Sequence, residues 1–141
     1  MRFMMLVIPK DYQTAAPDAA PDAKIVERMT RYNEELAKAG VLLSLDGLKP
    51  PSAGVRISFA GGKPKVTDGP FAEAKECVGG YWIIQVKSRE EAIEWAKRCP
   101  ASENEMIEVR QVQEMSDFPD EYQEAAAGYP EMQAESRQRT P

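Results

Sequence analysis

The order of the apolar segments is the feature that most constrains the fold, because it reads strand, helix, strand twice along a chain of 141 residues. The first unit covers residues 2–46 and the second covers residues 79–112. Between them, residues 55–67 carry Gly61-Gly62 at their centre and predict an inserted β-hairpin. Two such units around one sheet are typical of the split ferredoxin-like arrangement, so we expect one α+β domain.

The first unit has clear boundaries. Residues 2–8 form a short apolar run, which favours a strand covered on both faces. Asp22 is a suitable N-cap for a helix over residues 23–39, Gly40 supplies its stop, and residues 41–46 follow as a second strand candidate. Apolar residues recur along this helix at helical spacing: Ile25, Met29, Tyr32 and Leu36.

The second unit is marked equally well. Residues 79–86 are apolar on both alternating faces, which predicts a strand in the middle of the sheet. Ser88 and Glu91 match the capping box that opens a helix, and Pro100 closes it. Residues 106–112 alternate apolar and charged side chains, as a half-buried final strand does.

The sheet is expected to need a second copy of the chain. Two helices cover only one face of a four-stranded sheet, yet residues 2–8 and 79–86 are apolar on both faces. We therefore expect an isologous homodimer. Residues 1–112 are predicted to form the domain, and residues 113–141 a tail that is either disordered or a short helix near residues 120–127, docked on the domain or on the partner subunit.

Composition excludes several classes of function. The chain has no histidine, which removes histidine general-base catalysis, Ser-His and Cys-His nucleophile pairs and histidine-ligated metal sites. We find no metal-ligand spacing and no cofactor motif. The net charge is −5 and the basic residues are scattered, so nucleic acid is not an expected direct partner.

The chain is expected in the cytoplasm. Its apolar N-terminal run is too short for a signal peptide or a membrane span, so no membrane partner is expected. The two cysteines, Cys77 and Cys99, show no disulfide pattern, and we expect reduced thiols.

Residues 68–76 are the segment in which chemistry is expected, because they combine turn formers, an aromatic residue and four charges. In one interpretation this is a turn, in which Asp68 accepts backbone N–H bonds and Phe71 plugs the core. In the other it is a pocket wall that supplies an acid or base and an anion binder: Asp68, Glu73 or Glu76, and Lys75. Asp46 forms a carboxylate pair with Asp68 if their loops meet, although an aspartate before glycine is usually a turn former.

The same segment carries a family resemblance. Asp68-Gly69-Pro70-Phe71 with Glu73 and Lys75-Glu76, followed by Gly79-Gly80-Tyr81, resembles the signature of the DGPF group of YCII-related proteins. Asp46-Gly47-Leu48 before Pro50-Pro51, and the later Glu108-Val109-Arg110, occur in the same order as in that group. The resemblance spans residues 1 to about 112 and leaves the tail uncovered.

The resemblance implies a dimeric α+β barrel, close to small monooxygenases and muconolactone isomerase, with pockets beside the inter-subunit sheets. Better-studied YCII-like relatives are suspected enzymes with a histidine and aspartate pair, and this chain has no histidine to match. Members of the DGPF group are often encoded beside extracytoplasmic-function sigma factors, which implies a regulatory or accessory role.

Three hypotheses follow from the sequence. The preferred one is a homodimer that binds a small molecule or a protein partner in an accessory or regulatory role. The alternative is a cofactor-free enzyme on a small organic substrate, with Asp68 or Asp46 as acid or base. The third is an interaction module that uses the acidic tail. The expected ligand-binding residues are Gly69, Pro70, Phe71, Glu73, Lys75 and Tyr81.

Overall fold

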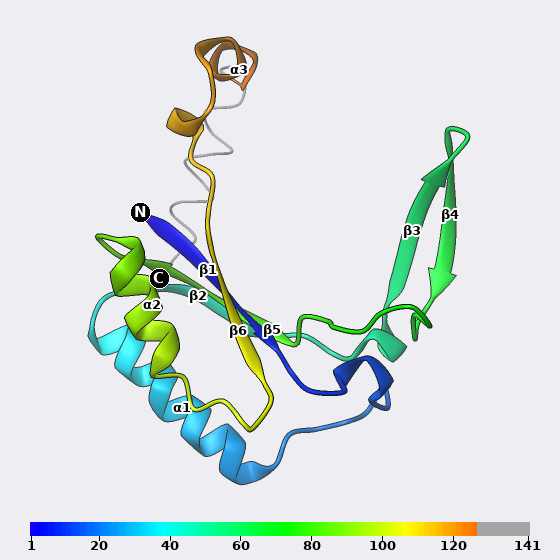
Figure 1. Ribbon diagram of the computed structural model, residues 1–141, viewed down its shortest axis with the longest axis horizontal. Helices are drawn as coiled ribbons and strands as arrows, with labels where there is room; N and C mark the ends of the chain where they lie inside the picture. Colours follow the sequence, from blue (N-terminus) through cyan, green and yellow to red (C-terminus); the bar gives the residue numbers. More distant parts are fainter. Residues whose placement is uncertain (127–141) are drawn as a thin grey trace.

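The protein is an α+β domain with a β-hairpin inserted at its middle (Figure 1). The computed structural model describes residues 1–126. In chain order its helices and strands are β1 (Arg2–Ile8), α1 (Ala23–Lys38), β2 (Leu42–Gly47), β3 (Val55–Ala60), β4 (Lys63–Asp68), β5 (Gly80–Gln85), α2 (Arg89–Lys97), β6 (Met106–Gln111) and α3 (Asp120–Ala126). The two predicted strand–helix–strand units and the hairpin between them are confirmed.

Four strands form one antiparallel sheet in the order β2-β5-β1-β6, and β3 pairs only with β4 in a separate ribbon. The central strands are β5 and β1, the two segments whose apolar residues fall on both faces. A strand in the middle of a sheet has neighbours on both sides and can be covered above and below, which is why this pattern predicts its position.

The helix ends lie where the capping residues predict them. Asp22 accepts a hydrogen bond from the backbone N–H of Lys24 at 2.7 Å, and Gly40 follows α1 with a φ of 72°, the left-handed conformation that glycine adopts without strain. Ser88 accepts from the N–H of Glu91 at 3.1 Å. The Glu91 carboxylate bonds the N–H of Lys87 rather than that of Ser88, so the reciprocal half of the predicted capping box is shifted by one residue.

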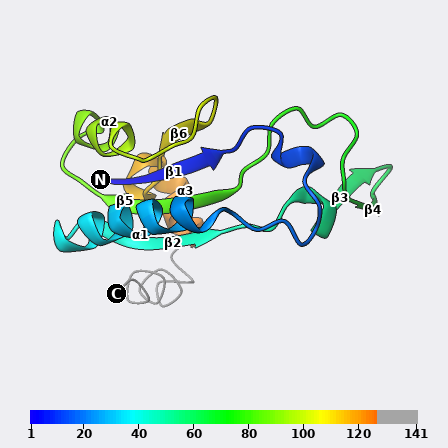
Figure 2. The same cartoon turned by 90° about the horizontal axis from the view of Figure 1, so that it is seen from below.

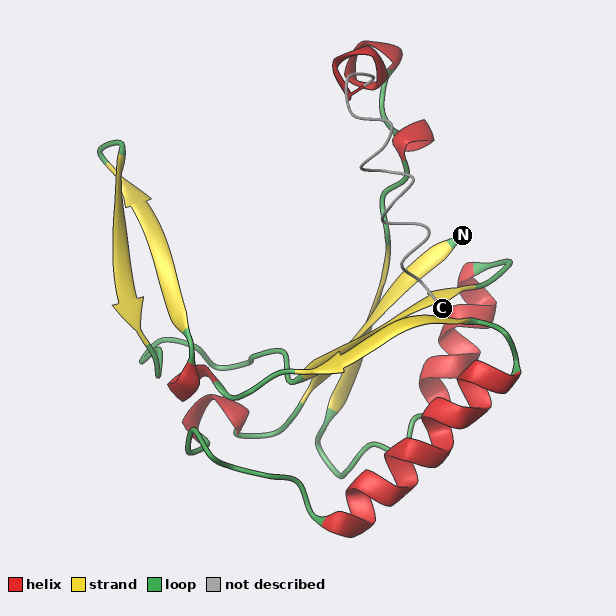
Figure 3. Cartoon of the chain, turned by 180° about the vertical axis from the view of Figure 1, so that it is seen from behind, coloured by secondary structure: helices red, strands yellow, loops and turns green. Residues whose placement is uncertain are grey.

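Both α1 and α2 lie on one face of the sheet, where they bury the core (Figures 2 and 3). The buried apolar residues are Phe3, Met5, Tyr32, Leu36, Val41, Trp82, Ile84, Val86 and Ala92. Tyr32 and Trp82 meet edge to face with their centroids 5.6 Å apart, and the Tyr32 hydroxyl donates to the carbonyl of Trp95 at 2.6 Å. Core packing therefore fixes the second half of α1 firmly against β5.

The opposite face of the sheet also carries apolar side chains. Strand alternation places Met4, Leu6 and Ile8 of β1 there, beside Tyr81 and Ile83 of β5, and all five are half-buried. Within residues 1–126 no helix lies across this face, whereas the β3–β4 hairpin and α3 project on its side of the sheet (Figure 3). We call these residues the open face.

The hairpin differs from its expectation. Its alternating sequence predicts one face packed and one face in water, but every residue of β3 and β4 is exposed, with Phe59 at 77% and Val55 at 56%. The reason is that the ribbon pairs with no strand of the main sheet and stands clear of it (Figure 1). The glycines at its turn, Gly61 and Gly62, both have positive φ, as a tight two-residue turn requires.

The beginning of the tail is attached to the sheet. Arg2 of β1 forms a two-pronged ion pair with Glu114, at 2.7 and 3.1 Å, and the N–H of Val112 donates to the carbonyl of Arg2. The helix expected near residues 120–127 is present as α3, and the rest of that expectation, residues 127–141, lies outside the described residues. Within the described chain no helix is long and apolar enough to cross a membrane.

Candidate functional site

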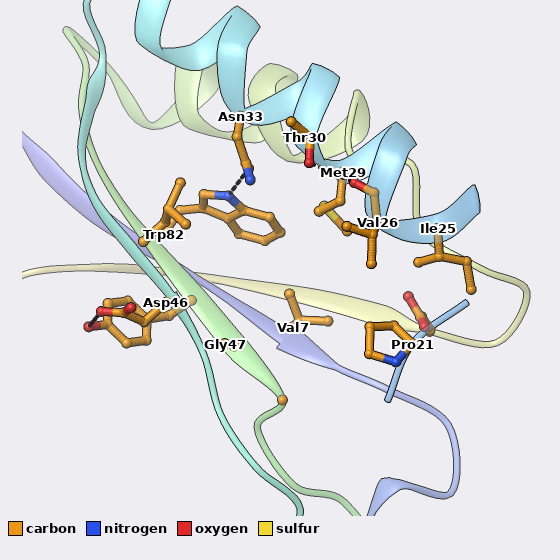
Figure 4. A pocket seen from close by; sticks show the side chains of 15 residues that line it. Val7, Pro21, Ile25, Val26, Met29, Thr30, Asn33, Asp46, Gly47 and Trp82 are labelled. Carbon is orange, nitrogen blue, oxygen red and sulfur yellow. Dashed lines mark hydrogen bonds between the residues drawn. The ribbon is translucent and has the colours of Figure 1, made fainter. Parts of the chain in front are cut away.

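A pocket of about 320 Å³ lies between the first half of α1 and the ends of β2 and β5 (Figure 4). We call it the α1–β5 pocket. Its apolar wall comes from four elements: Val7, Ile25, Val26, Met29, Leu45 and Trp82. Because α1 buries Tyr32 and Leu36 but leaves Ile25 and Met29 only half-buried, the helix and the sheet diverge toward the N-terminal end of α1. The pocket occupies the space between them.

Several polar atoms in the pocket wall already form hydrogen bonds within the protein. The indole N–H of Trp82 donates to Asn33 Oδ1 at 2.7 Å, which holds the ring against α1 (Figure 4). The Thr30 hydroxyl donates to the Val26 carbonyl at 2.8 Å, and Glu105 accepts from the N–H of Ser102 at 3.1 Å. A ligand in this pocket therefore meets mostly apolar surface and a fixed aromatic ring.

Gly79 and Gly80, at the start of β5, allow this part of the pocket wall to approach other segments of the same chain closely. A Cβ on Gly79 would lie 2.5 Å from Pro9 Cγ, and one on Gly80 would lie 3.0 Å from the carbonyl oxygen of Asp46. The Gly79 N–H donates to the Val7 carbonyl at 2.8 Å. The Gly-Gly step before Tyr81 is thus explained by close contacts, since a side chain at Gly79 would overlap the Pro9 ring and one at Gly80 would crowd the backbone of β2 at Asp46.

Asp46 and Tyr81 are brought together by the sheet. They are register partners on β2 and β5, and the Tyr81 hydroxyl donates to Asp46 Oδ2 at 3.2 Å. Because Trp82 points toward α1, strand alternation directs Tyr81 to the open face. Both residues border the α1–β5 pocket, but their side chains pair on the other side of the sheet.

Residues 68–76 lie elsewhere, at the base of the hairpin. None of the residues expected there lines the α1–β5 pocket: Asp68, Gly69, Pro70, Phe71, Glu73 and Lys75. Asp68 is the exposed last residue of β4, and its side chain makes no hydrogen bond to another described residue. None of the interactions found within residues 1–126 joins Asp68 to Asp46, so the structure gives no support for a carboxylate pair.

The distinctive residues of this segment organise the backbone. The Gly69 N–H donates to the Gly54 carbonyl at 2.9 Å, and a Cβ on Gly69 would lie 1.7 Å from the carbonyl oxygen of Pro51. The Gly69–Pro70 peptide is cis. Phe71 does not reach the core and is half-buried beneath the guanidinium of Arg56, whose Cζ is 4.1 Å from the ring centroid.

Neither cysteine is activated as a nucleophile. Both thiols are free. Burial raises the pKa of Cys77, with the Arg56 charge acting in the opposite direction, and burial together with Glu105 raises the pKa of Cys99 to about 11. A thiol with a raised pKa stays protonated at neutral pH and is a poor nucleophile. Within residues 1–126 no three acidic or cysteine side chains are grouped as a metal site.

Sequence reasoning missed most of the pocket residues. Pro21, Val26, Asn33 and Glu105 carry no motif, and the spacing of Ile25 and Met29 predicts that they face the core. One signal was available: Val26 is apolar although it lies beside the predicted core stripe, and it is 46% exposed. An apolar residue there widens the apolar face beyond what the core needs.

The fold and the site define a small α+β domain with an apolar pocket beside a partly covered antiparallel sheet. The YCII-related domain model matches residues 1–116, so the chain belongs to the YCII-related domain family. This confirms the resemblance at the level of that family. The chain is also similar to an uncharacterised protein of Rhizobium meliloti (strain 1021), with 28% identity over 97 residues, which cover 69% of this chain and 78% of that protein.

Proposed function

We propose that the protein binds a small, largely apolar molecule in the α1–β5 pocket and serves an accessory or regulatory role. The observation that carries this proposal is the pocket itself. Its volume of about 320 Å³ lies at the lower end of the range of small-molecule sites, and its wall is apolar with a rigidly held indole. The accessory role rests on the resemblance to the DGPF group, whose members are often encoded beside extracytoplasmic-function sigma factors.

The chemistry of the wall defines the class of ligand. Trp82 offers an aromatic surface, and Val7, Ile25 and Met29 offer aliphatic ones. Because Asn33 Oδ1 and the Thr30 hydroxyl already bond protein groups, an apolar ligand costs these two atoms no hydrogen bonds. A flat or short-chain organic molecule with few polar atoms fits these surfaces best.

We propose that the working form is a homodimer with a ferredoxin-like subunit fold. The strand order β2-β5-β1-β6, with the hairpin set aside, is the order of a split βαβ-βαβ sheet and supports this assignment. The half-buried apolar residues of the open face support a second copy as its cover.

A ligand screen with matched variants tests the binding proposal. Small acids, lactones and aromatic metabolites are screened by thermal shift and by intrinsic tryptophan fluorescence, which comes from Trp82 in the pocket wall and from Trp95. A ligand at one hundred times its dissociation constant adds about 2.7 kcal/mol to the free energy of unfolding, enough for a shift of several degrees. Val26→Phe fills the pocket from an exposed helix position, and Arg28→Phe adds the same ring on the same helix outside the pocket.

The proposal expects a ligand that binds wild type, Arg28→Phe and Asp68→Ala but not Val26→Phe. Equal binding to Val26→Phe would overturn the assignment of the pocket. Loss of binding in a folded Asp68→Ala variant would move the site to residues 68–76. The absence of any ligand in the screen would count against small-molecule binding altogether.

One observation favours a particular form of the enzyme alternative. The Tyr81 hydroxyl bonds Asp46, whereas no described residue bonds the Asp68 carboxylate, so Asp46 has the better-defined geometry for an acid or base. Turnover of a screened compound that disappears in folded Asp46→Asn would support this second function. Turnover unchanged by that substitution would exclude Asp46 from the reaction.

A further inference from the structure

The β3–β4 hairpin has two chemically unlike faces. Directly paired residues of an antiparallel ribbon share a face, and here Ile57 pairs with Val66 and Phe59 with Pro64. With Val55, these residues make one face mostly apolar, and its one charged residue is Asp68, the partner of Val55 at the base of the ribbon. The other face carries the cations Arg56, Lys63 and Lys65. An amphipathic ribbon of this kind is suited to lie against another surface.

The apolar face of the hairpin is uncovered in the single chain. Phe59 is 77% exposed and Val66 is 63% exposed. An isolated two-stranded ribbon is at best marginally stable in water unless its apolar face packs on something. Arg56 already rests on Phe71 through the opposite face, so it is the apolar face that lacks a contact surface among the described residues.

A second arm of the molecule has complementary properties. Residues 112–126 contain no lysine or arginine, and Asp117, Asp120, Glu121 and Glu124 are all exposed there. Tyr122 of α3 is 57% exposed, and its ring lies 6.1 Å from that of Phe118. The ion pair between Arg2 and Glu114 fixes the start of this arm to β1. The arm therefore presents an aromatic patch among carboxylates.

The hairpin and α3 project on the same side of the sheet, the side of the open face, from different ends of the molecule (Figures 1 and 3). Suppose that a second copy covers the open face, related by a two-fold axis that lies in the interface. If this axis is perpendicular to the line from the hairpin to α3, it brings each hairpin to the α3 end of the other copy. We propose that in the homodimer the apolar face of each hairpin packs on the Phe118–Tyr122 patch of the partner.

Charge supports the second copy as the occupant. Lys63 and Lys65 make the hairpin positively charged near its tip, and residues 112–126 carry only carboxylates among their charged side chains, so the two arms attract each other. Each chain carries one hairpin and one α3. A two-fold symmetric dimer therefore forms the same hairpin–α3 contact twice and leaves neither element uncovered. The inference rests on the homodimer proposed above and adds which surfaces meet.

Cross-linking between co-expressed full-length chains tests the arrangement. In a background of Cys77→Ser and Cys99→Ala, one chain carries Ala60→Cys at the hairpin tip and the other carries Ala125→Cys on α3, both at exposed positions. A flexible bis-maleimide is expected to join them into a covalent heterodimer. Ala60→Cys paired with Arg28→Cys, on the helix-covered side, is the control and is expected to give little product. Sedimentation of the unmodified protein gives its oligomeric state.

The outcomes separate the two proposals. A dimer whose Ala60–Ala125 cross-link exceeds the control supports the pairing of the arms. A dimer with no excess cross-link overturns that pairing, leaves the homodimer standing, and points to another partner for the hairpin, such as an acidic peptide. A monomer at every concentration overturns both.

Charge reversal provides an independent measurement. Lys63→Glu with Lys65→Glu is expected to weaken the dimer by about tenfold, and adding Glu121→Lys with Glu124→Lys in the same chain is expected to restore it. A dimer indifferent to the first pair, or not restored by the second, contradicts the proposed contact.

Discussion

The α1–β5 pocket and residues 68–76 contrast in how their sequences relate to their structures. The pocket is built from ordinary helix and strand residues, and one of them, Trp82, is 4% exposed and belongs to the core. Residues 68–76 carry the most distinctive sequence in the chain, yet Asp68, Glu73 and Lys75 are exposed, and Gly69 serves a close approach of two backbone segments. A distinctive sequence marks a demanding backbone path as readily as it marks a binding site.

Replacing the aromatic residue of each region gives the largest expected difference. Trp82→Ala removes a buried ring and its N–H bond to Asn33, and we expect a loss of about 4 kcal/mol in the free energy of unfolding. Phe71→Ala removes a half-buried ring that stacks on Arg56, and we expect about 1 kcal/mol. Urea unfolding measures both values. Equal losses would mean that Phe71 is as much a core residue as Trp82.

Substituting alanine for glycine at two positions at the base of the hairpin, Gly69 and Gly54, gives the next largest expected difference in stability. In Gly69→Ala the new methyl group would overlap the Pro51 carbonyl, and we expect destabilisation of about 2 kcal/mol. Gly54→Ala is the matched control, because its Cβ would lie 3.5 Å from that same oxygen, an ordinary contact. If the two variants unfold at the same urea concentration, the close approach at Gly69 does not account for the glycine.

The two cysteines report on burial through the pH dependence of their reactivity. Cys99 packs against the core with its pKa raised to about 11, so alkylation should reach half its maximal rate near that pH. Because the folded chain holds this proton more tightly than the unfolded chain, the free energy of unfolding should fall as pH rises from about 9 to about 11. The rate of carbamidomethylation at each cysteine, followed by mass spectrometry, checks the profile. A midpoint for Cys99 near 9 would show that burial does not protect it.

The Asp46–Tyr81 pair has the smallest expected effect. Its hydrogen bond is exposed, so Tyr81→Phe should change the free energy of unfolding by less than about 0.5 kcal/mol, and it should leave ligand binding in the α1–β5 pocket intact. Chemical unfolding and the ligand titration measure the two quantities. A large loss of stability would show that the pair holds β2 against β5, and a loss of binding would place the Tyr81 side chain in the site.

The local structure was predictable because its signals are local. Residues 2–8 form β1, Asp22 caps α1, Gly40 ends it, and Gly61-Gly62 turn the hairpin, each as the sequence indicates. The family followed from motifs spread over the same residues. The expected site residues said less about where a ligand binds. The local sequence around a carboxylate beside a turn is the same whether that carboxylate lines a cavity or faces water.

By itself, the sequence determined the order of helices and strands, the central place of β1 and β5, and the absence of histidine chemistry. Only the tertiary structure decided that α1 diverges from the sheet beside Ile25 and Met29, and that Asp46 meets Tyr81 rather than Asp68. The physical reason is range. Caps, turns and periodicity act over a few residues, whereas a pocket depends on the angle at which segments far apart in the sequence pack.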